Sequence, residues 1–346
     1  MTGKKIAVLG AGSWGTALAV HLSRKGFKPV LWSHRAAVAE EINKTRSNTR
    51  YLPGVTIPEN VFAETDIERA ICDSAIVVSS VPSHAFREVV SKGYVYFHPG
   101  TILVNTAKGI DENTLQRMSE IYAEISGGNT GNYVVLSGPS HAEEVGRGMP
   151  TAVVVASHDK DSSNLAQDIF MSGELRVYTN PDVTGVELGG ALKNIIALGT
   201  GIAEGLGFGD NAKAALMTRG LAEITRLGAA MGANPLTFAG LTGEGDLIVT
   251  CTSMHSRNRR AGIEIGRGKT LEEALSTVRM VVEGVRTTRA AKKLSDKYGI
   301  EMPITDQIYK VLFEKKDPGI AVEDLMGRGK KDEMGVLDLK ALFRRS

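Results

Sequence analysis

The sequence KIAVLGAGSWGT at residues 5–16 decides the fold of this chain. A short apolar run is followed by three glycines in the spacing Gly-x-Gly-x-x-Gly, and the apolar pattern of a helix comes next. This order predicts a strand, a tight turn at Gly10 and a helix, with Gly12 leaving space for a pyrophosphate and Gly15 allowing close packing. Because N–H groups at a helix start attract phosphate, the stretch predicts a dinucleotide-binding turn.

The next apolar run, Pro29–Trp32, predicts a second strand that ends near His34 and Arg35. In a dinucleotide-binding fold, an acidic residue at this point binds the ribose hydroxyls of NAD, whereas a basic residue accommodates the 2′-phosphate of NADP. The end of this strand carries no acid, so Arg35 and the adjacent His34 favour NADP. NAD stays open as the second cofactor, because both side chains also suit an ordinary surface at a strand end.

Further apolar runs predict strands at residues 75–81, 101–105, 133–136, 151–156 and 176–178. Strands that alternate with helices are typical of a parallel sheet, and from about residue 184 only helical patterns follow. We therefore predict an α/β protein with an N-terminal Rossmann-type doubly wound sheet and an all-α C-terminal domain. The predicted boundaries are 1–181 for a dinucleotide-binding domain, 182–331 for a helical substrate-binding domain and 332–346 for a tail, in which residues 337–343 could form a short helix.

Ligands of such sheets bind beyond the carboxyl ends of the strands. That rule brings Pro82, Lys108 and residues 138–140 to one crevice. A loop lysine is most often merely solvated. The position of Lys108 directly after a strand nevertheless makes it a candidate for contact with a ligand.

A long apolar helix is predicted at residues 185–199, with Lys193 as the cation near its middle. Small residues share the face of this lysine at helical spacing, namely Gly189, Gly190, Ala197 and Thr200. We expect them to leave a hollow around a partly desolvated lysine that is suited to proton transfer. A lysine that extends to solvent is the alternative, but it does not explain costly glycines inside a helix.

Two later stretches carry further charged candidates. Asp246 follows flexible glycines, a position that suits a functional carboxylate and the N-cap of a helix equally well. The run Ser256–Arg260 combines arginines with Ser256 and Asn258 and is a plausible anion cradle, since guanidinium groups bind phosphate bidentately. A solvated basic face is the alternative for this run.

Composition limits the class of protein. The 346 residues are 42% hydrophobic and 23% charged, which indicates a globular protein of about two domains. The 41 basic and 39 acidic residues form no stripe that would bind nucleic acid. Cys72 and Cys251 have no metal or redox spacing, so we expect two packed, reduced thiols and no metal site. With no predicted signal peptide or membrane span, we expect a cytoplasmic protein.

Many motifs in a fixed order make the chain resemble the bacterial glycerol-3-phosphate dehydrogenases from about Ile6 to Lys331. The motifs are GAGSWGTALA at 10–19, VPSH at 81–84, KG at 108–109, GPSHAEE at 138–144, LGGALKN at 188–194, GFGDN at 207–211, GEGDL at 243–247, SRNR at 256–259 and VEG at 282–284. The family reduces dihydroxyacetone phosphate to sn-glycerol 3-phosphate with NAD(P)H. The resemblance therefore implies this activity, in the service of glycerophospholipid synthesis.

The resemblance also implies roles for single residues. Lys193 would be the general acid and base, with Lys108 and Asp246 as further catalytic residues that help to hold the substrate. The remaining substrate contacts would be Gly138, Ser140, Ser256, Arg257 and Asn258. The cofactor would be lined by Ser13, Trp14, His34, Lys108, Ala142, Arg257, Val281 and Glu283, together with Gly10, Gly12, Gly15 and Arg35 from the turn and the strand end.

Two alternatives remain at this point. Another two-domain dehydrogenase, of the 3-hydroxyacyl or ketopantoate type, shares the glycine turn and the helical second domain, but the run Ser256–Asn258 favours a phosphorylated substrate. A non-catalytic NADP sensor would need the turn but not Lys193, Lys108 and Asp246. We expect a small-molecule substrate, neither nucleic-acid binding nor stable membrane insertion, and, from the family, a homodimer.

Overall fold

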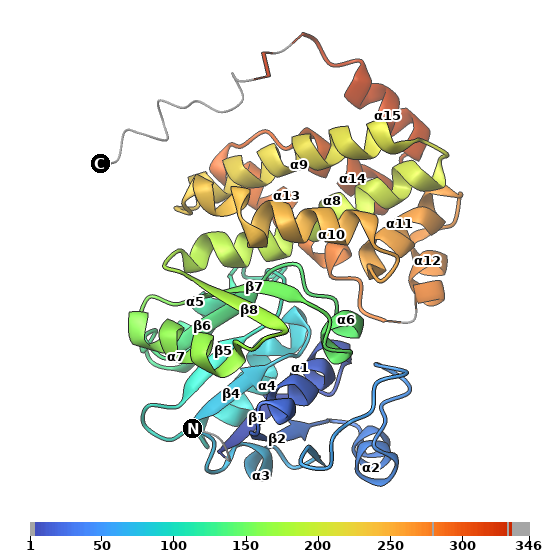
Figure 1. The fold of residues 1–346 in the computed structure, drawn as a ribbon. Coiled ribbons are helices and arrows are strands. Elements are labelled where there is room, and N and C mark those ends of the chain that lie inside the picture. The colour runs from blue at the N-terminus through green and yellow to red at the C-terminus, as the bar shows by residue number, and fades with distance from the viewer. Residues whose placement is uncertain (1–3, 279, 331, 334–346) are drawn as a thin grey trace. The chain divides into compact units, whose positions relative to one another are not determined.

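The computed structural model describes residues 4–278, 280–330 and 332–333, and it divides into two units (Figure 1). One unit contains the chain up to Lys108 together with Gln116–Val186. The other contains Gly109–Leu115 and the chain from Glu187 onward. Of the predicted tail, only residues 332 and 333 are described, and the short helix predicted at 337–343 lies outside the described residues.

The first unit is built on one sheet, which has eight strands within the described residues, in the order β3-β2-β1-β4-β5-β6-β7-β8. The strands are β1 (Lys5–Leu9), β2 (Lys28–Trp32), β3 (Phe62–Glu64), β4 (Ile76–Ser79), β5 (Ile102–Asn105), β6 (Tyr133–Ser137), β7 (Thr151–Ala156) and β8 (Leu175–Asn180). Leu9 pairs with both Trp32 and Ser79, so β1, β2 and β4 end together. Because the strand order changes direction at β1, helices after β1 and β4 cover opposite faces. The predicted fold class is confirmed.

Two details of the sheet differ from a purely parallel arrangement. The edge strand β3 has only three residues, too few for the sequence pattern to reveal it. The pairing of β6 with β7 is antiparallel, and β8 follows β7 in parallel. The connection between β6 and β7 contains only the five-residue helix α6 (Ala142–Gly146), and the chain returns along the sheet in the opposite direction.

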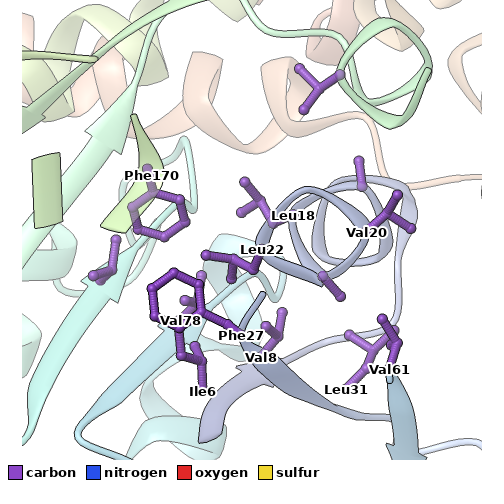
Figure 2. Packing of buried hydrophobic residues seen from close by; sticks show 14 of the residues in the cluster. Ile6, Val8, Leu18, Val20, Leu22, Phe27, Leu31, Val61, Val78 and Phe170 are labelled. Carbon is purple, nitrogen blue, oxygen red and sulfur yellow. The ribbon is translucent and has the colours of Figure 1, made fainter. Parts of the chain in front are cut away.

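Helices cover this sheet and bury its core. They are α1 (Ser13–Arg24), α2 (Ala36–Thr45), α3 (Ile67–Ile71), α4 (Ser83–Tyr94), α5 (Met118–Ile125), α6 and α7 (Lys160–Phe170). Leu22 of α1 points toward Phe27 and Phe170, within a cluster that also contains Val8 of β1 (Figure 2). This packing fixes α1 on the sheet and thereby the position of the glycine turn before it.

The second unit is helical. Its elements are α8 (Val183–Gly205, whose first turn belongs to the first unit), α9 (Asp210–Ala230), a 3₁₀ turn (Pro235–Ala239), a π-helical turn (Leu241–Gly245), α10 (Asp246–Thr252), α11 (Arg257–Gly266), α12 (Leu271–Val278), α13 (Glu283–Tyr298), α14 (Pro303–Phe313) and α15 (Pro318–Met326). The fully buried residues Leu188, Leu192 and Leu198 of α8 belong to its core. Burial of α8 explains its nearly continuous apolar sequence.

Glycines let α8 cross α11 at close range. A Cβ added to Gly201 would lie 2.2 Å from the carbonyl oxygen of Arg259, and one added to Gly262 would lie 2.2 Å from that of Leu198. Gly205 and Gly266 repeat this contact one turn later. Only glycine permits the two helix backbones to come so close.

Two further sequence predictions can be compared with the structure. Cys251 is buried as expected, and burial raises the pKa of its thiol to about 11. The prediction that Cys72 is packed was wrong, because it follows the short helix α3 at an exposed turn. Among the described residues, no helix is long and apolar enough to cross a membrane.

Candidate active site

The glycine turn of the first unit matches the needs of a dinucleotide. Gly10 adopts φ +112°, and a Cβ there would lie 2.8 Å from the carbonyl oxygen of Ser80. A Cβ on Gly15 would lie 1.9 Å from the carbonyl oxygen of Gly10, so the first turn of α1 rests directly on the loop. Around Gly12, by contrast, a Cβ would meet nothing within 4 Å. The turn therefore offers open backbone at the N-terminus of α1, which fits a pyrophosphate.

Two side chains hold this turn in place, and sequence reasoning missed one of them, Asn48. The buried Asn48 donates from Nδ2 to the carbonyl oxygen of Ala11 at 3.0 Å and to the hydroxyl of Thr16 at 2.8 Å. Ser13, a predicted cofactor residue, donates its hydroxyl to the carbonyl oxygen of Tyr51 at 2.6 Å. Trp14 packs partly against the core of the unit. Asn48 lies more than 30 positions from the turn, so no local pattern identifies it.

The residues predicted to select the cofactor follow β2. His34 and Arg35 are both exposed, and Nε of Arg35 lies 3.2 Å from Nε2 of His34. Arg35 is also the N-cap residue of α2, without a capping bond from its side chain. This exposed basic pair at a strand end fits a 2′-phosphate.

Three of the predicted substrate residues meet at one carbonyl group of the first unit. Lys108 donates from Nζ to the oxygen of Gly138 at 2.9 Å, and the hydroxyl of Ser140 donates to the same oxygen at 3.0 Å. Gly138 has φ +132°, and a Cβ there would lie 3.0 Å from Cα of Val153. Ala142, a predicted cofactor residue, is buried at the start of α6. The structure thus brings Lys108, Gly138 and Ser140 together beyond the ends of β5 and β6.

The second unit contains a buried lysine that is held by two oxygens. Lys193 on α8 is 5% exposed and forms a short ion pair with Asp246, which is 1% exposed. Nζ of Lys193 also donates to the hydroxyl of Thr250 at 2.6 Å, and this hydroxyl donates to the backbone oxygen of Asp246 at 2.6 Å. Asp246 and Thr250 share one face of α10 at a spacing of four. A buried ammonium with a fixed position and a paired carboxylate is a suitable proton donor and acceptor.

The prediction that Gly189 leaves a hollow beside Lys193 was wrong. A Cβ at this position would lie 2.7 Å from the backbone oxygen of Thr242. The glycine makes room for the π-helical turn Leu241–Gly245, which α10 directly follows. This close approach brings Asp246 within reach of Lys193.

The two interpretations of Asp246 can now be separated. The cap residue of α10 is Gly245, and Asp246 is the first residue of the helix itself. Its carboxylate forms an ion pair with Lys193, so the N-cap interpretation was wrong and the functional one stays a prediction. Thr250 was missed by sequence reasoning, and the only available signal was its spacing of four from Asp246.

Amide groups join three helices next to this centre. Asn258 of α11 donates from Nδ2 to Oδ1 of Asn194 on α8 at 2.8 Å, and its Oδ1 accepts from the backbone N–H of Gly284 on α13 at 2.8 Å. A Cβ on Gly284 would lie 2.6 Å from the backbone oxygen of Asn194. Asn258 therefore fixes the start of α13, where the predicted cofactor residues Val281 and Glu283 are half-buried.

The basic run at the start of α11 divides into different roles. Ser256 is the N-cap and accepts from the N–H of Arg259 at 3.2 Å. The guanidinium of Arg259 donates to both carboxylate oxygens of Glu204 at 2.7 and 2.8 Å. Arg257 is half-buried at the first helical position, beside the positive end of α11. Arg257 and that helix end are the groups of this run that suit an anion best.

Comparison with known proteins assigns this geometry to a family. The model described as the N-terminus of NAD-dependent glycerol-3-phosphate dehydrogenase matches residues 5–163, and the model of its C-terminus matches residues 182–323. The chain belongs to this family. The resemblance inferred from the sequence motifs is thereby confirmed, and the alternative dehydrogenase types lose their support.

Individual members of the glycerol-3-phosphate dehydrogenase family are similar over nearly their whole length. A protein of Pelotomaculum thermopropionicum named glycerol-3-phosphate dehydrogenase [NAD(P)+] is 64% identical over 97% of both chains. A protein of Desulfitobacterium hafniense with the same name is 57% identical over 98% of this chain and 95% of its own. The crystal structure of the glycerol-3-phosphate dehydrogenase of Coxiella burnetii has a TM-score of 0.91 and 40% identity, and the match covers 94% of this chain and 99% of that one.

Proposed function

We propose that this protein catalyses the reversible reduction of dihydroxyacetone phosphate to sn-glycerol 3-phosphate with NADPH or NADH. The observation that carries this proposal is the buried contact of Lys193 with Asp246 and Thr250 in a chain of this family. A protein that only senses a dinucleotide has no need for a buried lysine of this kind.

The chain's own residues supply proton transfer and orientation. When bound, the nicotinamide supplies the hydride for the substrate's carbonyl carbon. Lys193 donates a proton to the oxygen that becomes an alkoxide, and it takes the proton back in the reverse direction. Asp246 and Thr250 hold the Nζ atom of Lys193 in one position, which lowers the entropic cost of the transfer.

Recognition of the substrate's phosphate is assigned to Arg257 and the N-terminus of α11. A bidentate guanidinium and helix N–H groups are both suited to phosphate. Ser256 and Asn258 contribute by capping α11 and by fixing it to α8 and α13. Lys108, Gly138 and Ser140 of the first unit would provide further substrate contacts, and the ammonium of Lys108 would stabilise negative charge.

The cofactor is assigned to the glycine turn and the strand ends. Gly10, Gly12, Gly15, Ser13 and Trp14 would hold the pyrophosphate side, and Ala142, Lys108, Arg257, Val281 and Glu283 would complete the site. His34 and Arg35 would favour NADP through its 2′-phosphate, with NAD as a second cofactor. In this proposal residues 1–181 are the dinucleotide-binding domain and residues 182–331 the substrate-binding domain, and each domain also contributes the contacts named above to the other ligand. We further propose a cytoplasmic homodimer that supplies glycerophospholipid synthesis.

The direct test follows the loss of reduced-nicotinamide absorbance on addition of dihydroxyacetone phosphate, with NADPH and NADH in parallel. Unphosphorylated dihydroxyacetone is the control for the role of the phosphate. We expect rapid oxidation with the phosphorylated ketone alone, and faster oxidation of NADPH than of NADH. Protein that binds NADPH without oxidising it would contradict the proposed reaction.

Substitution of Lys193 tests the proposed mechanism. The variant Lys193→Met should lower turnover by ~10²–10⁴, because the proton donor is lost, while NADPH binding is retained, because the glycine turn is unchanged. The exposed Lys28→Met is the matched control and should keep its turnover. A folded Lys193→Met variant with near-normal turnover would exclude Lys193 as the general acid.

A further inference from the structure

A groove in the helical unit lies among elements that the proposed reaction does not use. It has a volume of about 720 Å³ and is formed by the C-terminal end of α8, by α9, by the start of α14 and by α15. We call it the α9 groove. None of the residues assigned above to the cofactor or the substrate lines it. Its size is within the range of sites for small organic ligands, about 300–1,000 Å³.

The walls of the α9 groove are largely apolar. Phe208, from the GFGDN motif that no proposed role has yet explained, lines it and is 41% exposed. Leu216 of α9 and Val322 and Leu325 of α15 continue the wall. α9 and α15 both pack against α14 (Figure 1). Exposed apolar walls inside a groove indicate a ligand with an apolar part.

Three guanidinium groups also line the groove, together with the carboxylates of Glu223, Glu301 and Asp332. Arg219 and Arg226 are seven positions apart on α9 and therefore lie on one face, and Arg328 follows α15. Burial lowers the pKa of the Arg226 guanidinium, and the charges of Arg219 and Arg328 lower it further, whereas those of Glu223 and Glu301 raise it. All three stay protonated, because a guanidinium does not lose its proton in proteins.

The donors of these arginines are only partly satisfied. Nη2 of Arg226 donates to the backbone oxygen of Glu301 at 2.8 Å, but its buried Nη1 has no partner in the described part of the chain. Arg219 forms no ion pair within the described ranges, whereas Arg328 pairs with Glu301 at 3.3 Å. A buried charged donor without a partner is costly, so an anion at this point would stabilise the groove.

The nearby carboxylate of Glu223 does not fill this need. It is buried, and its two oxygens accept from the backbone N–H groups of Ile304 at 2.6 Å and Thr305 at 3.1 Å, the first turn of α14. Glu223 attracts Arg226 electrostatically, but it forms no ion pair with it among the described residues. Arg219 and Arg226 are therefore the arginines of the groove that form no ion pair within the described part of the chain.

We propose that the α9 groove binds a single-chain amphiphile with an anionic head group, either a carboxylate or a phosphate monoester. Arg219 and Arg226 would hold the head through their N–H groups, and the alkyl chain would lie along Phe208, Leu216 and Leu325. Arginine binds both kinds of head bidentately. This site is independent of the proposed catalytic centre, so each can fail without the other.

The test uses the full chain and titration calorimetry with dodecanoate and dodecyl phosphate below their micellar concentrations. Dodecyltrimethylammonium and inorganic phosphate are the controls for the charge and for the chain. We expect the two anionic amphiphiles to bind at least about tenfold more tightly than either control, since binding needs both the arginines and the apolar wall. Comparison of the two anions shows which head group the site prefers.

Three variants locate the binding. Arg219→Met should weaken both anionic amphiphiles about tenfold or more, because one charged head contact is lost. Ala215→Trp should abolish binding by filling the groove. Arg267→Met, at an exposed arginine outside the groove, should leave binding unchanged. The far-ultraviolet circular dichroism spectrum of each variant reports that the protein is folded.

Several results would overturn the proposal. They are equal affinity for the cationic amphiphile, no binding of either anion, and binding that survives Ala215→Trp. Light scattering tests one more outcome. If the unchanged protein binds no amphiphile and Ala215→Trp changes its molecular mass in solution, the groove is a contact surface for a second copy.

Discussion

Lys193 and Asp246 form the charge pair in the helical unit on which the proposed chemistry depends. Both side chains are buried, and their desolvation is compensated by each other and by Thr250. Such a pair contributes little net stability compared with apolar residues, but removal of one partner leaves the other unpaired. The pair is therefore retained at a cost in stability, as is common at functional sites.

Substitution of one partner should expose this cost. We expect Asp246→Asn to lower the free energy of unfolding by about 3–5 kcal/mol, because the charge of Lys193 stays buried without its partner. Urea unfolding measures the change. Asp210→Asn, which removes an exposed ion pair with Lys213, is the control and should have little effect. The double variant Lys193→Met/Asp246→Leu should regain most of the loss, and a failure to do so would point to packing instead of charge.

Glu223 is a second buried carboxylate, with a structural role. It satisfies the first turn of α14 from a neighbouring helix, and burial raises its pKa to about 6 from 4.5. Between pH 4.5 and about 6 the Glu223 carboxyl keeps its proton in the folded protein, whereas the unfolded chain has lost it. The contribution of Glu223 to stability is therefore complete below pH 4.5 and falls as the pH rises toward 6.

The variant Glu223→Gln lacks this titration. We expect the free energy of unfolding of the variant, minus that of the unchanged protein, to rise by about 2 kcal/mol between pH 4.5 and 6 and to stay level above that range. Urea titrations at a series of pH values measure the difference. Glu272→Gln on the exposed side of α12 is the control and should give a flat difference. A flat difference for Glu223→Gln as well would mean that the carboxyl titrates normally in the fold.

At the scale of elements, helix packing positions both Lys193 and the start of α11. Gly201 and Gly262 allow the backbones of α8 and α11 to touch, and Arg259 and Glu204 join the same two helices. Gly189 does the same for α8 and the π-helical turn before α10. The glycines of α8 thus serve the approach of other elements, which explains why a helix tolerates them despite their low propensity.

Addition of one methyl group tests this crossing. Gly201→Ala should lower the free energy of unfolding by about 1–3 kcal/mol, because the new Cβ would overlap the backbone oxygen of Arg259 and force the helices apart. This loss should exceed the helix-propensity gain of about 1 kcal/mol. The control Gly173→Ala, where a Cβ meets nothing within 4 Å, should leave stability unchanged or slightly raised. If thermal unfolding shows that Gly201→Ala is more stable than the unchanged protein, the two helices have room to separate.

At the scale of the whole molecule, the chain passes between its two units more than once. The sequence predicts one boundary after residue 181, but Gly109–Leu115 pack with the helical unit. Ile110 is 2% exposed in the core of that unit. Glu112 accepts from Arg286 at 2.8 Å, and its backbone oxygen accepts from Lys293 at 3.0 Å. A cut at residue 181 would therefore remove part of the helical core.

The substitution Ile110→Ala tests how much this segment contributes. We expect a loss of about 2–5 kcal/mol in the free energy of unfolding, from lost burial and the cavity left behind. The exposed Asn113→Ala in the same segment is the matched control and should change stability by less than about 0.5 kcal/mol. Equal unfolding curves for Ile110→Ala and the unchanged protein would exclude the segment from the core.

Local patterns in the sequence were sufficient for seven of the eight described strands, the glycine turn and the helical second half. The turn could be predicted because glycine spacing, strand and helix lie within twelve positions, and Gly10 and Gly15 each meet a steric demand of neighbouring backbone. Lys193 and Asp246 could be named because each is a charge in an unusual local setting. Residues 5–16 by themselves therefore determined the kind of fold and the class of cofactor to be expected.

Only the tertiary structure decided how these residues are held. Thr250 contacts Lys193 from 57 positions away, Asn258 reaches Asn194 across 64, and Glu223 caps α14 across 81. The same holds for Gly189, whose role is the approach of the π-helical turn and not an open hollow. Such contacts depend on which helix faces meet, and periodicity reveals that a face is buried without revealing its neighbour. The sequence determined which groups are available, and packing decided which of them meet.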